Sequence, residues 1–325
     1  MFTQHWPRVL SAALVCVSSA VLLAGPTYIN PKEVDDDYAI QGEYAGELKT
    51  DEGKEKFGIQ LIALGKAKFQ VVGYHGGLPG DGWNGEKVIR IEAAMVDGVL
   101  VAKDEHGSGT LKDGVFTIKG PDGDEFGKLK KVTRVSPTMG AKPPQDAVVL
   151  FDGKDAKQWK NGKVTEDGLL EQGTETIPEF SSHTLHIEFL LPYKPEDRGQ
   201  GRGNSGLYLQ ARYEVQMLDS FGLAGKDNEC GGIYSIKDPD LNMCFPPLTW
   251  QTYDVDFTAA KYDGDKLVSN PKMTVRHNGV VIHKDVELPK STTAAPRGPG
   301  VKPGPIYLQN HGNPVRFRNI WVSPK

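Results

Sequence analysis

A carboxylate and an amide share one face of a predicted strand in the second half of the chain. The segment YEVQMLD (213–219) is rich in β-prone residues, and alternate side chains of a strand point to the same side. Glu214 and Gln216 therefore face one way, and Asp219 follows where the turn-forming sequence SFGLAGKDNECGG must end the strand. A surface strand would carry such a pair for solubility, whereas a sugar-binding groove would use it for chemistry.

The segment GRGNSG (201–206) has the glycine spacing of a dinucleotide-binding loop but lacks its context. Such a loop lies between a strand and a helix whose N-terminus meets the pyrophosphate. Here KPEDRGQGR precedes the glycines and a strand-like sequence follows them, so nucleotide binding is not predicted. Glycine still lets a backbone approach a ligand closely, with Asn204 and Ser205 available as hydrogen-bonding groups. A merely flexible loop is the alternative.

The composition favours strands and gives no electrostatic case for nucleic-acid binding. The 325 residues include 38 glycines and 22 prolines, 38% are hydrophobic, and the net charge is −4. No segment is dominated by lysine and arginine, as a nucleic-acid footprint would be. A chain of this length can form two domains, and its many glycines and prolines favour short strands and turns over long helices.

The N-terminus has the features of an export signal. Arg8 precedes the apolar run VLSAALVCVSSAVLLAG, which ends in small residues and is short for a membrane span of about 20 residues. We therefore expect residues 1–25 to be a signal peptide and the mature protein to be periplasmic or extracellular, without a stable membrane span. An uncleaved anchor helix is the alternative.

Two cysteines remain in the expected mature chain. Cys230 and Cys244 could form a disulfide in an oxidising compartment, or both could be buried free thiols. Their spacing does not decide between the two, because pairing geometry cannot be read from sequence.

Turn signals divide the rest of the chain into two β-rich parts. Residues 35–134 contain Asp97-Gly98 and Asp113-Gly114 between β-prone runs, which is a strong hairpin signal. This part is predicted to be a small antiparallel meander or barrel. The segment VSPTMGAKPPQDA (135–147) is typical of a linker, and residues 148–325 form a second all-β domain.

The second domain shows no sustained helical periodicity. One of its strand candidates contains Asn278-Gly279, the signature of a type I′ hairpin turn. Many short strands with closely spaced turn signals indicate a β-sandwich or jelly roll. The candidates are 183–191, 206–218, 231–236, 251–259, 272–288, 304–311 and 315–322.

Seven sequence blocks occur in a fixed order between residues 147 and 323. They are LFDGKDAKQW, HIEF, GRGNSGLYLQARYEVQMLDSFG, GGIYSI, PPLTWQTYDVDF, VRHNGVVIH and GPIYLQNHGNPVRFRNIWV. Together they resemble the 3-keto-disaccharide hydrolase family. The resemblance implies a concanavalin-like jelly-roll sandwich for this part of the chain. With the small antiparallel β domain predicted from the turn signals before it, the expected fold class is all-β. The resemblance also implies an exported, carbohydrate-active enzyme that cleaves glycosides oxidised at C3 of a glucose unit.

The chemistry of a 3-keto-glycoside sets what such a site must contain. The carbonyl acidifies the C2 proton, so a base can remove it, the C1 substituent leaves by β-elimination, and water then adds to the enone. The site needs this base, a group that holds the enolate charge and an acid for the leaving oxygen. On the resemblance, Glu214 is the predicted base and Gln216 binds a hydroxyl or orients it. His311 and Asp219 complete the predicted catalytic set.

Other residues of the matching blocks are predicted to bind the substrate. Asn204 and Gln309 are assigned to sugar hydroxyls. Tyr234 and Trp250 are assigned to stacking on a sugar ring, although packing is the commoner role of such aromatics. Arg318 would hold an enolate oxygen or pair with the base.

A divalent metal ion is a further option, because a metal stabilises an enediolate through oxygen and imidazole ligands. Its candidate ligands are Glu188, Asp219 and His311. Glu188 shares a strand face with His186, and the two would meet Glu214 if their strands were neighbours. No ligand-spacing motif in the sequence requires a metal.

Two other functions remain open for this chain. The first is a non-catalytic glycan-binding module, in which the polar residues only bind hydroxyl groups. The second is a jelly-roll glycosidase acting on unoxidised sugars. The second is disfavoured because such enzymes place two or three carboxylates on one strand, where this chain has an amide at Gln216.

Overall fold

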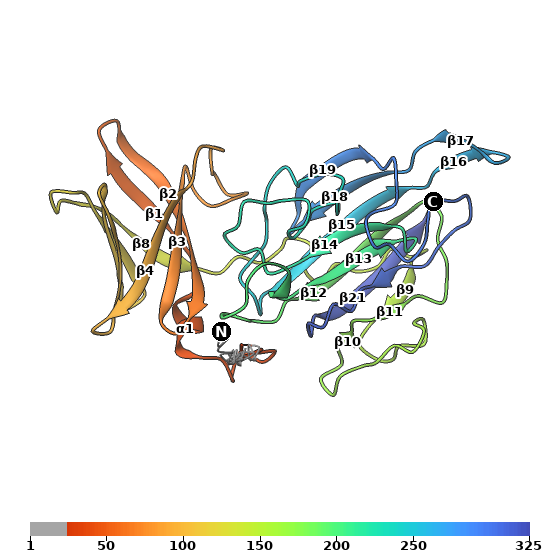
Figure 1. The fold of residues 1–325 in the computed structure, drawn as a ribbon, viewed down its shortest axis with the longest axis horizontal. Coiled ribbons are helices and arrows are strands. Elements are labelled where there is room, and N and C mark those ends of the chain that lie inside the picture. The colour runs from red at the N-terminus through yellow and green to blue at the C-terminus, as the bar shows by residue number, and fades with distance from the viewer. Residues whose placement is uncertain (1–24) are drawn as a thin grey trace, which may run out of the picture.

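The computed structural model describes residues 25–325, which are almost entirely β-strands and loops (Figure 1). The only helices among these residues are α1 (Asp36–Ile40) and the 3-10 turn η1 (Gly199–Gly201). Within residues 25–325, no helix is long and apolar enough to cross a membrane. Apart from its last residue, the predicted signal peptide lies outside the described part of the chain.

The first half of the chain forms a closed antiparallel barrel of eight strands. Each strand pairs with the next, and the last returns to pair with the first. The predicted Asp-Gly turns are confirmed, since Asp97 and Asp113 have φ of 49° and 50° and connect neighbouring strands. The strands are β1 (Gly42–Thr50), β2 (Gly53–Gly65), β3 (Lys68–His75), β4 (Ile89–Val96), β5 (Val99–Asp104), β6 (Gly107–Lys112), β7 (Val115–Lys119) and β8 (Glu125–Val132).

Two packed antiparallel sheets form the second half. The larger runs in the order β10 (Leu170–Glu171), β21 (Arg316–Pro324), β12 (His183–Leu190), β15 (Trp250–Thr258), β18 (Lys272–His277) and β19 (Val280–Glu287), with β9 (Val148–Phe151) also paired to β21. The smaller runs β11 (Thr174–Glu175), β20 (Tyr307–Leu308), β13 (Ser205–Leu209) and β14 (Tyr213–Met217). A separate ribbon joins β16 (Lys261–Asp263) and β17 (Lys266–Ser269).

Alternation along the strands determines which side chains lie between the two sheets. Ile187 and Phe189 of the large sheet and Leu207 and Val215 of the small sheet are fully buried in one apolar core. Their neighbours along each strand must point to the outer faces, because successive side chains alternate. The predicted fold class, an all-β sandwich preceded by a small antiparallel β domain, is confirmed.

Three strand predictions need correction. Residues 206–218 are not one strand but the hairpin of β13 and β14, because Gln210 and Ala211 adopt left-handed conformations with φ of 53° and 54°. Residues 231–236 form a loop whose backbone pairs with the edge of β14, with Gly231 N and Gly232 O bonded to Gln216 at 2.9 Å. Of 304–311, only Tyr307–Leu308 is a strand.

The segment predicted as a linker packs closely on the outer face of the large sheet. The Ser136 hydroxyl lies 2.6 Å from that of Thr252, and the Thr138 hydroxyl donates to Asp254 at 2.7 Å. The Gly140 amide donates to Glu188 at 2.6 Å. These contacts hold the segment against strands β12 and β15.

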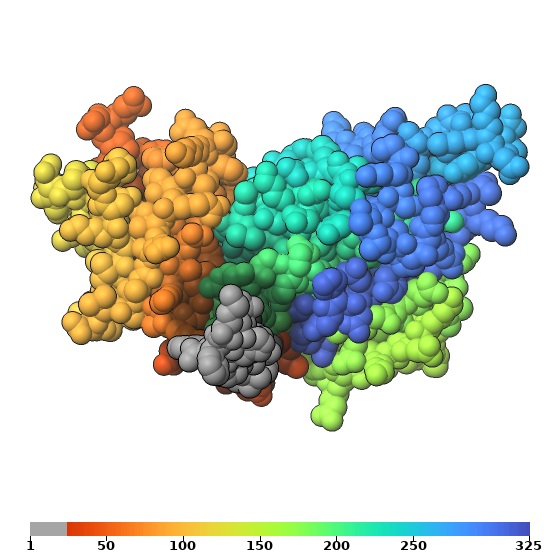
Figure 2. Space-filling model, viewed as in Figure 1, coloured from red at the N-terminus to blue at the C-terminus, as the bar shows by residue number. Residues whose placement is uncertain are grey.

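The barrel and the sandwich contact each other directly, as Figure 2 shows for the orange barrel and the teal segment of the sandwich. Phe221 packs into a small apolar cluster with Ile62, Val72 and Tyr74 of the barrel. The Arg202 guanidinium of the sandwich donates to the carbonyl oxygen of Ala63 at 3.3 Å.

Candidate active site

A hairpin brings four polar or small residues together on the outer face of the small sheet. In the β13–β14 register, Tyr208 lies opposite Glu214 and Gly206 opposite Gln216. The residues between them point into the core, so these four share the outer face. Glu214 and Gln216 therefore lie on one face, as predicted from the alternation.

Glu214 is the buried acid of this face, with only 2% of its surface exposed. Burial raises its pKa to about 7, although a hydrogen bond with the Tyr208 hydroxyl acts in the opposite direction. A carboxyl group with this pKa exchanges a proton readily near neutral pH.

Gly206 makes room for the Glu214 carboxylate. A Cβ atom at position 206 would lie 2.1 Å from Glu214 Oε1, a distance that no pair of non-bonded atoms tolerates. The absence of a side chain at Gly206 therefore sets where the carboxylate can lie on the sheet.

Four amides lie next to the acid, and three of them are hydrogen-bonded to one another. Gln200 Oε1 accepts from Asn204 Nδ2 at 2.8 Å and from Gln216 Nε2 at 3.2 Å. Gln309 Nε2 donates to the Tyr208 hydroxyl at 3.1 Å, and Gln309 N donates to Gly206 O at 2.9 Å. Gln309 therefore joins the Tyr208–Glu214 pair.

Two acceptor atoms of these amides have no partner in the described chain. Asn204 Oδ1 and Gln309 Oε1 are buried and make no hydrogen bond. A buried acceptor without a donor costs about 1–3 kcal/mol, and sugar hydroxyl groups are donors of the kind that would satisfy it. Asn204, Gln216 and Gln309, all predicted to bind substrate, thus lie around the predicted base.

Half-buried side chains border this face, whose own residues on β13 and β14 are buried. They are Gln200, Tyr234, Tyr307 and Gln309. The Tyr307 ring lies 5.4 Å from that of Tyr208, measured between centroids. The Tyr234 amide nitrogen lies 3.4 Å from Glu214 O. Tyr234, predicted to stack on a sugar, therefore adjoins the acid.

His311 is exposed on the loop that follows Gln309. Its carbonyl oxygen accepts from Asn313 Nδ2 at 3.1 Å, and Asn313 Oδ1 in turn accepts from Gly203 N at 3.3 Å. This second contact holds the loop next to the segment that carries Asn204.

Asp219 belongs to a structural ion pair beside the site. Its carboxylate lies 2.6 Å from Arg202 Nε, and both side chains are almost fully buried. Asp219 Oδ1 also accepts from the Phe221 amide at 3.3 Å. Because Arg202 reaches Ala63 of the barrel, Asp219 supports the contact between the barrel and the sandwich.

Glu188, Arg318 and Trp250 form a second cluster on the opposite face of the sandwich. Arg318 Nε donates to Glu188 at 2.6 Å, and its guanidinium lies 3.9 Å from the Trp250 ring centroid. Strands β12 and β14 belong to different sheets, so His186 and Glu188 do not meet Glu214. Trp250 and Arg318 instead border a cavity of about 490 Å³ between the barrel and the sandwich.

The second cluster is a buried charge network. His186 Nδ1 lies 2.6 Å from Asp254 and its Nε2 lies 3.7 Å from Glu188. Burial alone would raise the pKa of Glu188, but hydrogen bonds from His186, Asn319, Arg318 and the Gly140 amide outweigh it and hold the pKa at about 2. This acid is permanently ionised at neutral pH.

The candidate metal ligands are not brought together. Glu188 lies on the large sheet, Asp219 is paired with Arg202, and His311 is on an exposed loop. Within residues 25–325, no three histidine, cysteine or acidic side chains form a group able to hold a metal ion.

Both cysteines of the sandwich are buried free thiols, the second of the two alternatives. Cys230 Sγ lies 3.2 Å from the Tyr253 hydroxyl in the core.

Sequence reasoning missed Tyr208, Gln200 and Tyr307. A single strand over 206–218, as predicted, does not pair Tyr208 with Glu214. Only the turn at Gln210-Ala211 places the two residues opposite each other. The alternation of apolar residues continues unbroken through Gln210, Ala211 and Arg212, so it gives no local signal of the turn. Gln200 and Tyr307 reach the face through long-range contacts that leave no local signal.

Comparisons with known proteins match a little more than half of this chain. The sequence model of the 3-keto-alpha-glucoside-1,2-lyase-like domain matches residues 146–323. A solved structure described as a putative glycosyl hydrolase from Parabacteroides distasonis ATCC 8503 is 33% identical, with a TM-score of 0.52, and the match covers 56% of this chain and 85% of that one. A second structure with the same description and organism is 19% identical, with a TM-score of 0.41, over 56% and 94% of the two chains. Among curated proteins, no match was found.

Proposed function

Because the chain belongs to the 3-keto-alpha-glucoside-1,2-lyase-like family, we propose that it cleaves 3-keto-glycosides by proton abstraction, β-elimination and hydration. The family and the 33% identical neighbour make it a glycosyl hydrolase-like protein that acts on carbohydrate. The proposal adds the oxidised substrate, the reaction steps and the roles of the residues around Glu214.

The proposed reaction has two steps. In the first, the base removes the proton from C2, the electron pair of that bond forms the C1–C2 double bond, and the C1–oxygen bond breaks. The leaving oxygen takes a proton and departs as an alcohol. In the second, water adds its oxygen to C1 of the enone and C2 regains a proton, which completes a net hydrolysis.

The observation that carries the proposal is the environment of Glu214. Its pKa of about 7 leaves a large fraction ionised at neutral pH, while the conjugate acid is stable enough to hold a proton taken from carbon. In the proposed reaction Glu214 is the base, and the hydrogen bond from Tyr208 keeps its pKa from rising further.

A single reactive carboxylate suits elimination better than direct hydrolysis. Ordinary glycosidases use two carboxyl groups on either side of the scissile bond. On β14 the residue that shares the face of Glu214 is the amide Gln216, and the nearby Asp219 is held by Arg202. This arrangement supports a substrate whose own carbonyl activates the bond.

The surrounding amides suit the remaining part of the substrate. In the proposal, Asn204 Oδ1 and Gln309 Oε1 accept hydrogen bonds from sugar hydroxyl groups, which satisfies two buried acceptors. Tyr234 borders the ring, and His311, on the exposed loop, supplies the proton to the leaving oxygen. An imidazole can carry and donate a proton, which suits this role.

The test is turnover of a 3-keto-glucoside beside its unoxidised parent, with and without chelator. The Glu214→Gln variant keeps the shape of the side chain but removes its basicity. Glu166→Gln, the same change at an exposed position of the sandwich, is the matched control. We expect the wild type to turn over only the keto substrate. The rate should fall by about 10²–10⁴-fold in Glu214→Gln and stay unchanged in the control.

Other outcomes would redirect the assignment. Glycan binding without turnover of either substrate would make the protein a binding module. Equal turnover of the parent sugar would contradict the elimination route. Loss of activity with chelator would add a metal ion to the proposed reaction.

We also propose that the protein acts outside the cytoplasm, on the strength of the N-terminal apolar run. Mass spectrometry of the protein from its native host tests this, because cleavage near residue 25 is expected and an intact N-terminus would argue against it.

A further inference from the structure

The barrel contains a pocket that the proposed reaction does not use. Its volume is about 650 Å³, within the range of about 300–1,000 Å³ that holds small ligands in proteins. Protein interiors are otherwise packed as densely as organic crystals, so a space of this size in an eight-stranded barrel is a distinct feature. Barrels of eight strands are just wide enough to hold one small ligand.

One end of the barrel is filled and the other is open. Tyr44, Leu61 and Phe69 are buried in the core of the barrel, and Tyr193 of the sandwich packs against the same core. None of these four borders the pocket. The pocket instead lies toward the β1–β2, β5–β6 and β7–β8 turns, since Asp51, Asp104 and Asp124 line it.

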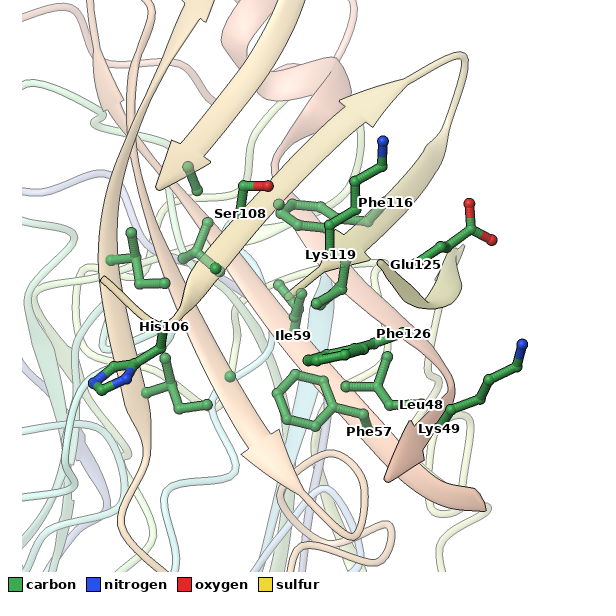
Figure 3. A pocket seen from close by; sticks show the side chains of 18 of the residues that line it. Leu48, Lys49, Phe57, Ile59, His106, Ser108, Phe116, Lys119, Glu125 and Phe126 are labelled. Carbon is green, nitrogen blue, oxygen red and sulfur yellow. The ribbon is translucent and has the colours of Figure 1, made fainter. Parts of the chain in front are cut away.

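The wall of the pocket is apolar and rich in aromatic rings. Phe57, Phe116 and Phe126 line it together with Leu48 and Ile59. Figure 3 shows these side chains gathered in the pocket. Phe126 and Ile89, both also lining residues, are each 38% exposed, so apolar surface continues from the interior to the mouth.

Glycines on neighbouring strands let the rings lie against the wall. A Cβ atom at Gly109 would lie 2.4 Å from Phe116 Cε1, and one at Gly73 would lie 2.8 Å from Phe57 Cζ. Both glycines line the pocket. Larger residues at these positions would push the rings inward, so the two glycines keep the space open.

The mouth of the pocket carries more negative than positive charge. Five carboxylates and two lysines line the pocket: Asp51, Glu55, Asp104, Asp124 and Glu125, with Lys49 and Lys119. Glu125 also pairs with Lys128 and Glu55 with His75, which leaves the carboxylates in excess. Coulomb repulsion therefore disfavours an anionic group at the mouth. An apolar molecule with a neutral or cationic polar end is the chemistry that fits.

We propose that the barrel is a binding site for a neutral, apolar small molecule with aromatic rings, held between Phe57, Phe116 and Phe126. The pocket opens at the turn end of the barrel. Phe221 of the sandwich packs against Ile62, and Arg202 donates to Ala63 O; neither barrel residue lines the pocket. We therefore expect binding in the barrel to be separable from the reaction at Glu214.

The test uses a matched pair of fluorescent probes on the full chain. N-phenyl-1-naphthylamine is neutral, and 8-anilino-1-naphthalenesulfonate has the same ring system with a sulfonate. We expect saturable one-site binding of the neutral probe and at least tenfold weaker binding of the sulfonate. Absence of saturable binding of the neutral probe would overturn the proposal, and tighter binding of the sulfonate would overturn its charge preference.

Variants locate the bound probe. Ala102→Phe fills the pocket, because Ala102 lines it, and Ala94→Phe makes the same change on an exposed position of the adjacent strand. We expect at least tenfold weaker binding for the first and no change for the second. If Ala102→Phe does not fold, Phe126→Ser, at an exposed position, takes its place. We expect this variant to bind the neutral probe several-fold more weakly than the wild type. Wild-type affinity in Phe126→Ser and in a folded Ala102→Phe would overturn the proposal.

Discussion

Replacing Tyr208 by phenylalanine tests whether Glu214 titrates in the reaction. The Tyr208 hydroxyl is hydrogen-bonded to Glu214 and lowers a pKa that burial raises to about 7. Removing the hydroxyl should therefore raise the pKa of Glu214 further. A hydrogen bond to a charged group contributes about 1.5–3 kcal/mol, and one pKa unit corresponds to about 1.4 kcal/mol. We expect a shift of at least about one unit, to about 8 or above.

The assay is kcat/KM for a 3-keto-glucoside as a function of pH, because this quantity reports the ionisation of the free enzyme. The base must be deprotonated, so activity falls as pH falls through the pKa of Glu214. At pH 6 the ionised fraction would drop from about 10% in the wild type to about 1% in the variant. The two enzymes should converge above pH 9.

Tyr307→Phe is the matched control. Tyr307 pairs with Tyr208 across the strands, and its ring centroid lies 5.4 Å away, but its hydroxyl is not among the hydrogen-bond partners of Glu214 in the described chain. Its pH midpoint should match that of the wild type. A loss of activity in Tyr208→Phe that is equal at every pH, or a midpoint moved to lower pH, would refute the reasoning.

Three further changes separate the roles of neighbouring residues. Gly206→Ala places a Cβ atom 2.1 Å from Glu214 Oε1, so it should lower kcat and cost about 1–3 kcal/mol in a urea titration; unchanged kinetics would mean that the carboxylate moves freely. Asp219→Asn breaks a buried pair with Arg202 and should cost about 3–5 kcal/mol of unfolding free energy. The pH midpoint of activity of Asp219→Asn should equal that of the wild type, and a shifted midpoint would instead support a catalytic role for Asp219. Glu188 has a folded-state pKa of about 2, below its ordinary value of 4.5, so its contribution to stability is present above pH 4.5 and is lost as pH falls toward 2. Glu188→Gln should reduce the loss of unfolding free energy between pH 4.5 and 2. An unchanged pH dependence in that range would contradict the ion network.

Local patterns were sufficient for the fold class and for one face of the site. Asp97, Asp113 and Asn278 each precede a glycine and adopt positive φ, so the turns that need this conformation were visible in the sequence. The alternation of YEVQM likewise placed Glu214 and Gln216 on one side of a strand. These features depend only on neighbours in the chain.

Contacts between distant segments could not be predicted in the same way. The turn at Gln210-Ala211 uses residues that seldom adopt left-handed conformations, and it is held by Arg212 and by Phe180 through hydrogen bonds to the Gln210 side chain. Unless that turn is known, the pairing of Tyr208 with Glu214 cannot be predicted. Likewise, no local pattern shows that β12 and β14 belong to different sheets, which separates Glu188 from Glu214.

Cleavage by elimination breaks the C2–H bond of the sugar, whereas direct hydrolysis at C1 leaves that bond intact. The most direct measurement is cleavage of a 3-keto-glucoside in deuterium oxide, with the label located by NMR at early times. The same sugar product incubated without enzyme measures spontaneous exchange. Elimination and hydration predict deuterium at C2 of the released 3-keto sugar well above that background. Because the conjugate acid of Glu214 can return the same proton, the contradicting result is a product that retains its original C2 proton together with unchanged kcat/KM for a C2-deuterated substrate, which would favour direct hydrolysis at C1.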